Sequence, residues 1–155
     1  SSLYFEDFSV GQKFVSGGRT ITETDLTMFS MISGDWNPIH ADAVHAAGTR
    51  FGQRLVHGTL GIAVATGMMH ELGIFHRSVV AMTSIKDWRF HKPILVGDTI
   101  HLELEILALS DGKSPRMGNL ERRLGIVNQH GEAVQTGVSE VLVLKRGQGL
   151  ETQKQ

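Results

Sequence analysis

Cysteine is missing from the 155-residue sequence, and several kinds of chemistry are missing with it. No disulfide bond, thiolate metal site or cysteine nucleophile is available, and this fits a reducing compartment, so we expect a cytoplasmic protein. The beginning of the sequence has no cationic flank followed by an apolar block, which predicts that there is no signal peptide. The longest apolar stretch, near 59–69, is interrupted by glycine and threonine and is too short to cross a bilayer. It is interpreted as a buried helix.

An excess of charge of one sign is missing as well. The 15 lysines and arginines against 16 aspartates and glutamates give a net charge of −1, which provides no case for a nucleic acid or an anionic membrane as partner. The sequence contains no P-loop, no G-x-G-x-x-G and no G-x-S-x-G. The segment "HELGI" at 70–74 lacks the second histidine of a zinc-protease helix, so it does not predict a zinc site of that kind.

The sequence contains enough apolar residues to form one hydrophobic core. With 41% hydrophobic residues, and no internal repeat or low-complexity linker, the sequence predicts a single domain over 1–155. We expect its core to cover about 5–145, followed by a flexible tail at about 147–155 that is rich in polar residues.

The first third of the sequence alternates between strand-like and helical patterns. Residues 14–22 are typical of a strand, with a bend at a Gly-Gly pair. In 22–33, "TETDLTMFSMIS", apolar residues recur at helical spacing, with Thr24 as the predicted N-cap and Gly34 as the C-cap. A second, short helix is expected within 41–49.

The strongest helix signal lies at 57–73, where the sequence is apolar on nearly all faces, which predicts a helix buried all round. Four strand-like segments follow, at 78–90, 98–110, 119–129 and 132–145. The clearest evidence is strict alternation over 101–107, as in an antiparallel sheet with one covered face. The order of elements predicts an α+β fold in which a curved antiparallel sheet wraps around the long helix.

The segment "SGDWNPIH" places an acid and an imidazole on either side of a proline corner. Asp35 and His40 can divide general-base and general-acid work if an ordered loop over 35–40 holds them close together. Pro38 stiffens this spacing, and the side chain of Asn37 can bond nearby backbone. The alternative is that Asp35 only caps the next turn and that His40 is a buried, hydrogen-bonded histidine.

A glycine starts the long apolar helix. The first N–H groups of a helix lack internal partners and carry partial positive charge, so the N–H of Gly58 is a candidate donor to a developing oxyanion. The alternative is a glycine that only begins a helix. The later segment "DWRFHKPILVGDTI" at 87–100 is typical of a core strand that ends in a turn.

Together these segments resemble the MaoC-like dehydratase family, of the (R)-specific enoyl-CoA hydratase type. The resemblance covers about 5–145 and is carried by "SGDWNPIH", "TRFGQRLVHGTL" and "DWRFHKPILVGD", which occur in that order. It implies a hot-dog fold, in which an antiparallel β-sheet wraps around a long central helix, and a homodimer or higher homo-oligomer. Its implied partner is an acyl-CoA or acyl-carrier-protein thioester, and it implies neither a metal nor a cofactor beyond the CoA of the substrate.

The resemblance also assigns residues. By position in the motif, Asp35 and His40 are the catalytic pair, Gly58 is the backbone donor to the thioester oxygen, Asn37 organises the loop and Trp36 shapes the acyl pocket. The implied reaction is reversible hydration of a trans-2-enoyl-CoA, or a related enoyl thioester, to the 3-hydroxyacyl thioester, as in fatty acid metabolism.

Two other functions fit the same residues less well. A hot-dog acyl-CoA thioesterase would use a carboxylate and a helix-start amide to hydrolyse the thioester, and a non-catalytic acyl-CoA-binding module would need neither the acid nor the histidine. For the phosphates of CoA, the candidate cations near the motifs are Arg50, Arg54, Arg89 and Lys92, although each taken singly is better interpreted as an ordinary surface charge.

Overall fold

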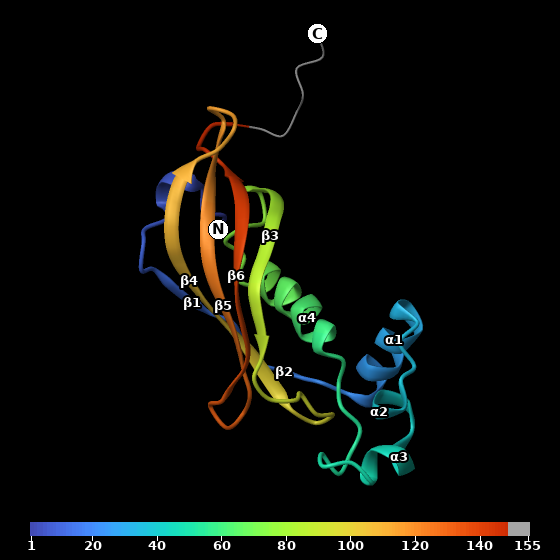
Figure 1. Ribbon diagram of the computed structural model, residues 1–155. Helices are drawn as coiled ribbons and strands as arrows, with labels where there is room; N and C mark the ends of the chain where they lie inside the picture. Colours follow the sequence, from blue (N-terminus) through green and yellow to red (C-terminus); the bar gives the residue numbers. More distant parts are fainter. Residues whose placement is uncertain (149–155) are drawn as a thin grey trace.

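The computed structural model describes residues 1–148, and most of the predicted tail at 147–155 lies outside the described residues. The elements follow the predicted order (Figure 1). In chain order they are η1 (Phe5–Asp7), β1 (Lys13–Val15), β2 (Arg19–Thr20), α1 (Glu23–Ser33), α2 (Pro38–Ala41), α3 (Ala43–Ala47), α4 (Gly58–Glu71), β3 (Val79–Phe90), β4 (Thr99–Asp111), β5 (Met117–Val127) and β6 (Ala133–Leu144). Within 1–148, no helix has the length and apolarity needed to cross a membrane.

The strands form one antiparallel sheet in the order β1-β4-β5-β6-β3, and β2 pairs with β4 beside this path. The alternation predicted over 101–107 is confirmed, because Leu102, Leu104 and Ile106 are buried while Glu103 is exposed. The predicted bend in the first strand is also confirmed. It divides the segment into β1 and β2, which pair with different parts of β4.

Helix α4 lies against one face of this sheet, and its N-terminal end points toward α1 and α2 (Figure 1). The prediction that α4 is buried all round is wrong. Its sheet-facing side is buried, through Leu60, Gly61, Val64, Ala65, Met68 and Met69. The opposite side is exposed, through Thr59, Ala63, Thr66, Gly67 and His70. The reason is that no described element covers the side turned away from the sheet.

The predicted N-cap of α1 is also wrong by two residues. Thr22, not Thr24, caps the helix, because its hydroxyl accepts the Asp25 N–H at 3.2 Å while the Asp25 carboxylate accepts the Thr22 N–H at 2.9 Å. This reciprocal pair outweighs a single cap two positions further on. Gly34 is the C-cap as predicted, with φ of 75° in the left-handed region.

The stretch predicted as an ordered loop at 35–40 is partly helical. Pro38 starts the single turn α2, because the first position of a helix needs no N–H and fits the φ of proline. Asn37 caps this turn by accepting the Ile39 N–H at 3.1 Å. His40 therefore projects from a capped helical turn.

Strand β3 turns one aromatic ring inward at an irregularity. Its register with β6 shifts between Lys86 and Arg89, and Asp87 adopts a left-handed φ of 52° at this point. The indole of Trp88 then lies over Gly137 of β6, where a Cβ would come within 2.3 Å of the ring. Gly137 is therefore required by this packing.

Replacing Gly137 by alanine is expected to lower the free energy of unfolding by about 1–3 kcal/mol, because the rigid indole of Trp88 would have to move. Denaturant unfolding measures this. The matched control is Gly125→Ala in the neighbouring strand, where the nearest atom to a Cβ is a backbone oxygen at 3.9 Å and little change is expected. Equal effects of the two substitutions would contradict the assigned packing.

Candidate active site

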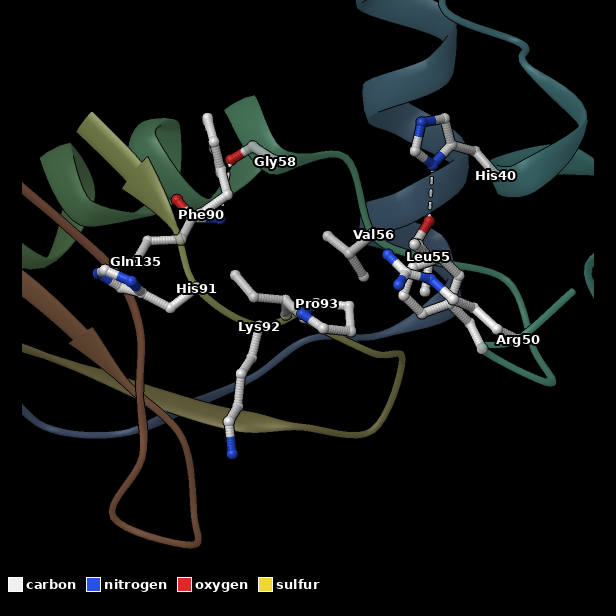
Figure 2. A pocket seen from close by; sticks show the side chains of 12 residues that line it. His40, Arg50, Leu55, Val56, Gly58, Phe90, His91, Lys92, Pro93 and Gln135 are labelled. Carbon is white, nitrogen blue, oxygen red and sulfur yellow. Dashed lines mark hydrogen bonds between the residues drawn. The ribbon is translucent and has the colours of Figure 1, made fainter. Parts of the chain in front are cut away.

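A cavity of about 330 Å³ opens at the N-terminal end of α4 (Figure 2). It lies between the start of this helix, the end of β3 and the segment that precedes α4. The residues that line it are His40, Arg50, Phe51, Leu55, Val56, Gly58, Phe90, His91, Lys92, Pro93, Ile94 and Gln135. Of the residues predicted from the sequence, His40 and Gly58 therefore share one cavity.

The segment before α4 is held on both sides by backbone hydrogen bonds. The Leu55 N–H donates to the Ile39 oxygen of α2 at 3.0 Å, and the Val56 N–H donates to the Ile94 oxygen at 2.9 Å. This ties the helical turn that carries His40 to the wall of the cavity. The position of the histidine is thus set by segments far apart in the sequence.

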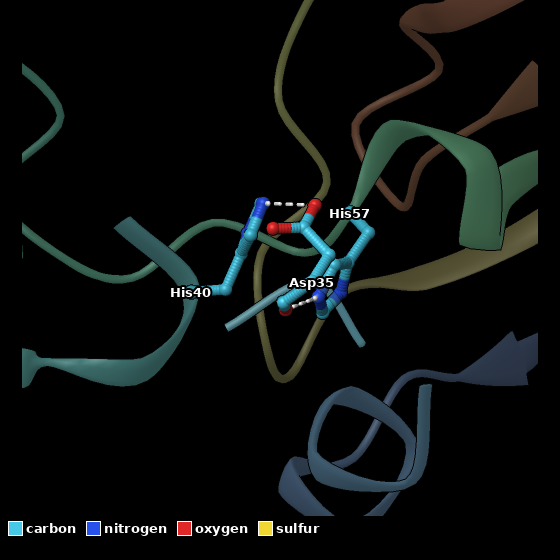
Figure 3. Close-up of side chains that lie close together, drawn as sticks. All are labelled: Asp35, His40 and His57. Atoms are coloured by element: carbon cyan, nitrogen blue, oxygen red, sulfur yellow. Dashed lines mark hydrogen bonds and ion pairs between the residues drawn. The ribbon is translucent and has the colours of Figure 1, made fainter. Parts of the chain in front are cut away.

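Asp35 and His40 approach each other across the short turn between α1 and α2 (Figure 3). The Asp35 Oδ2 lies 3.5 Å from the His40 Nε2. The carboxylate is half exposed, while only 13% of the His40 side chain is exposed. The other Asp35 oxygen, Oδ1, accepts the Asn37 N–H at 3.2 Å, which fixes the carboxylate beside the ring.

The backbone determines which His40 nitrogen can take up a proton. Nδ1 lies 2.7 Å from the Leu55 carbonyl oxygen (Figure 2), and a carbonyl can only accept, so Nδ1 carries the hydrogen. In the neutral ring the lone pair is then on Nε2, on the side of Asp35. Nε2 is therefore the nitrogen available to accept a proton from a group that approaches it on that side.

A second histidine, His57, packs against this pair. The His57 ring stacks on His40 with centroids 3.9 Å apart, and the Phe29 ring meets its edge at 5.0 Å. The His57 Nε2 donates to the Asp35 backbone oxygen at 3.1 Å and lies 2.9 Å from the Ser30 hydroxyl. This role of His57 was not predicted from the sequence, in which the residue only marks the start of a helix. The sequence feature that could have indicated this role is the position of His57 directly before Gly58.

Burial lowers the pKa of His57, against the smaller raising effect of its hydrogen bond to the Asp35 oxygen, and its Nδ1 is buried with no partner among the described atoms. A proton on Nδ1 would be a buried, unpaired donor. His57 is therefore neutral near pH 7, and His40 can become positively charged without a second cation stacked on it.

Gly58 is the first residue of α4, so its N–H belongs to the group that lacks intrahelical partners. A Cβ at this position would come within 2.7 Å of the Phe90 ring, so packing also requires a glycine here. Both interpretations of Gly58 made from the sequence are consistent with this geometry.

Gln135 holds the first turn of α4 and was not found from the sequence. Its Nε2 donates to the Gly58 oxygen at 3.0 Å, and its Oε1 accepts the Trp88 indole N–H at 3.1 Å. A Cβ on Gly61 would lie 2.5 Å from this carboxamide, so the absence of a side chain at Gly61 lets β6 approach the helix. The orientation of the first peptide of α4 follows from these contacts.

Asp35, His40 and His57 each offer a ligand atom within 4.8 Å of the others, which makes them a candidate metal-binding group. One nitrogen of each ring donates to a backbone carbonyl, which leaves Nε2 of His40 and Nδ1 of His57 as the possible ligand atoms, and the His57 Nδ1 is fully buried. The two rings are also stacked nearly parallel, with an interplanar angle of 23°, so they do not aim at a common point. The arrangement favours proton transfer over metal coordination.

Most of the other residues named from the sequence lie outside the cavity lining. The Trp36 side chain is half exposed and does not line the cavity, and Asn37 caps α2. Of the four candidate cations, Arg50 and Lys92 line the cavity, and Lys92 also pairs with Glu132. Of the two others, Arg54 pairs with Glu23 at 2.7 Å, and Arg89 is an exposed residue of β3.

A family profile described as "MaoC like domain" matches residues 7–125. The protein MaoC of Klebsiella aerogenes is 38% identical over 101 residues, which is 65% of this chain and 30% of that protein. A 3-hydroxybutyryl-CoA dehydratase of Methylorubrum extorquens is 34% identical over 109 residues, which is 69% of this chain and 66% of that protein. The chain thus spans less than two thirds of the length of both of these relatives.

Solved structures agree on the fold. A monoamine oxidase regulatory protein of Archaeoglobus has 35% identity and a TM-score of 0.85, and the match covers 93% of this chain and 95% of that protein's chain. The R-hydratase PhaJ1 of Pseudomonas aeruginosa has 30% identity and a TM-score of 0.74, covering 94% and 88%. A Mycobacterium tuberculosis protein with a double hot-dog fold, at 23% identity, has a TM-score of 0.82 and covers 97% and 47%. The predicted α+β hot-dog fold is confirmed.

The lowered pKa of His57 has a consequence for stability. Above its ordinary pKa of 6.5 the ring is neutral in both folded and unfolded chains, whereas below 6.5 only the unfolded chain takes up the proton readily. The free energy of unfolding is therefore expected to fall as the pH drops below 6.5. Urea unfolding of the natural protein and of His57→Gln between pH 7.5 and about 5 measures this. The free energy of unfolding of the variant should fall less over that range than that of the natural protein. The same pH dependence in both proteins would contradict the lowered pKa of His57.

Proposed function

The chain belongs to the MaoC-like domain family, and we propose that it reversibly hydrates a trans-2-enoyl thioester, with CoA as carrier, to the 3-hydroxyacyl thioester. One observation carries this proposal. The His40 Nε2, held in its proton-accepting form by the Leu55 carbonyl, lies 3.5 Å from the Asp35 carboxylate, beside a cavity that also contains the start of α4. A binding module has no use for such a pair.

In the proposed reaction, a water molecule lies between the Asp35–His40 pair and C3 of the substrate. Its oxygen forms a bond to C3 as one member of the pair takes a proton from it. The electron pair of the C2–C3 double bond moves toward the thioester, and negative charge gathers on the thioester oxygen. The Gly58 N–H stabilises that oxygen, and a proton delivered to C2 completes the addition of water. No cofactor takes part.

The carrier would lie at the rim of the cavity. Two cationic side chains, Arg50 and Lys92, line the cavity. Side chains of this kind bind the phosphate groups of CoA. We also propose that the exposed Trp36, two residues before Pro38, shapes substrate choice by contacting the carrier or the acyl group as it enters.

Asp35→Asn and His40→Ala are each expected to lower kcat/KM for hydration of crotonyl-CoA by about 10²–10⁴-fold, because each removes a member of the proton-transfer pair. Loss of the conjugated-enoyl absorbance measures the rate. The matched control is His45→Ala, in which an exposed histidine of α3, five residues from His40, is removed and wild-type activity is expected.

Four results would contradict the assignment. They are wild-type hydration by folded Asp35→Asn or His40→Ala protein, release of free thiol in place of hydration, activity that a chelator abolishes and zinc restores, and tight binding of crotonyl-CoA without turnover. The second would identify a thioesterase, and the third a metal site at Asp35, His40 and His57. The fourth would identify a binding module.

We also propose that two copies pair along β3. Among the described strands β3 bonds only to β6, so its other edge is open. Apolar side chains are exposed along it, at Val79, Met82, Ile85 and Phe90, and the adjacent face of α4 is uncovered. An open apolar edge of this length is a surface that soluble proteins normally cover. A second copy placed edge to edge would extend the sheet and cover both helices.

Ile85→Lys is expected to shift the protein from dimer to monomer, because a charged side chain on an open strand opposes pairing. Sedimentation velocity across a concentration series measures the mass. Val44→Lys is the matched control, since it places the same charge on an isolated exposed residue of α3. A natural protein that is monomeric at all concentrations, or a dimer unaffected by Ile85→Lys, would contradict the pairing.

A further inference from the structure

A charged side chain occupies a core position of β5. Alternate residues of this strand face the core, and three of them are aliphatic: Leu120, Leu124 and Ile126. The fourth inward residue in this series is Arg122, of which only 3% is exposed. Its neighbour Arg123 points outward and pairs with Glu105 at 3.1 Å. The pair Arg122-Arg123 thus places one guanidinium in solvent and one inside.

The buried guanidinium has polar contacts but no counterion. Its Nη2 donates to the Ser139 hydroxyl at 2.8 Å, and its Nη1 donates to the Met69 sulfur, a weak acceptor, at 3.2 Å. The Phe75 ring lies beneath it at 5.2 Å, and its Nε has no partner. No carboxylate of residues 1–148 forms an ion pair with Arg122.

Burial of this unpaired guanidinium is energetically unfavourable for the folded chain by itself. Burial lowers the pKa of Arg122 to about 10, so the group is still charged at neutral pH. A buried charge without a partner destabilises the folded chain, and an aliphatic side chain of similar volume would pack there with less loss. A guanidinium in this position is therefore explained by a counterion that is not part of the described chain.

Room for such a counterion exists next to the guanidinium. A cavity of about 460 Å³ lies at the C-terminal half of α4, lined by Thr66, Met69, His70, Phe75, His76, Val79, Met82, Arg122 and Val141. Most of these side chains are apolar, and Arg122 is the only lysine or arginine among them. Met69 is 11 residues after Gly58, so this cavity lies about 16 Å along the helix from the proposed oxyanion donor.

We propose that this cavity binds a carboxylate carried on a short apolar chain, with the carboxylate on the Arg122 guanidinium and the chain against Met69, Phe75 and Val141. A planar guanidinium with a free Nε–H matches the two oxygens of a carboxylate. The mostly apolar wall and the single permanent cation favour a monovalent anion on an apolar chain over an amine. The carboxylate can belong to a free acid or to the far end of a carboxylated acyl group.

The first experiment needs no turnover. Hexanoate is titrated into the full-length protein by calorimetry and by thermal unfolding, with hexan-1-ol and hexylamine as probes of equal length. Hexanoate is expected to bind and to raise Tm with concentration, whereas the alcohol and the amine leave Tm unchanged. Arg122→Met should weaken hexanoate binding more than tenfold, and Arg122→Lys, which keeps the charge but not the planar fork, should weaken it less.

Arg123→Gln is the matched control, because it removes the outward guanidinium of the same strand and should leave hexanoate affinity unchanged. Without ligand, Arg122→Met should unfold at the same or a higher urea concentration than the natural protein, since the unpaired buried charge is gone. Three results would overturn the proposal: equal stabilisation by hexan-1-ol, unchanged hexanoate binding in folded Arg122→Met or Arg122→Lys protein, or a change of oligomeric mass in Arg122→Met with hexanoate binding intact. The last would identify a carboxylate of a second copy as the counterion.

A second experiment distinguishes the two sources, and it rests on the proposed function. The values of kcat/KM are compared for crotonyl-CoA and for an enoyl-CoA that ends in a carboxylate and whose acyl chain is long enough to span the distance of about 16 Å from Gly58 to this cavity. If Arg122→Met lowers kcat/KM only for the carboxylated substrate, the acyl group supplies the carboxylate. If it changes neither, the ligand is a free acid. Failure of hydration altogether would refute the proposed function and leave the hexanoate result standing.

Discussion

The close approach of the first turn of α4 to β6 is the contact on which the site depends. It is possible because Gly61 has no side chain, so the Gln135 carboxamide lies against the helix and bonds both the Gly58 oxygen and the Trp88 indole. Three segments that are far apart in the sequence are joined at this point. The start of the helix thereby acquires a fixed direction, and His57, the residue before it, is placed under the Asp35–His40 pair.

The two stacked histidines differ because their backbone partners differ. The Leu55 carbonyl holds the hydrogen of His40 on Nδ1 and leaves Nε2 facing a half-exposed carboxylate. The Asp35 carbonyl holds the hydrogen of His57 on Nε2, and burial keeps that ring neutral. One ring can thus gain and lose a proton during a reaction, whereas the other has a positioning role. Neither assignment follows from the residue type alone.

The two cavities lie at opposite ends of one helix and differ in chemistry. The cavity at Gly58 is lined by His40, Arg50 and Lys92, with the Asp35 carboxylate beside His40, whereas the cavity near Met69 is mostly apolar with one buried guanidinium. The uncovered face of α4 and the open edge of β3 run between them. A second copy along β3 would bring the face of its own α4 to this surface, so both cavities would become part of a more enclosed interior.

The sequence by itself determined the order of elements, the four long strands and the Asp35–His40 pair, because alternation, helical spacing and a proline corner are local patterns. Only the tertiary structure decided which side of α4 is exposed, that Asp25 makes Thr22 the cap, and that His57 and Gln135 support the site. It also decided that Arg122 lies inside the core without a counterion. Each of these depends on contacts between residues distant in the sequence, and a side chain's burial, tautomer and partner are properties of those contacts.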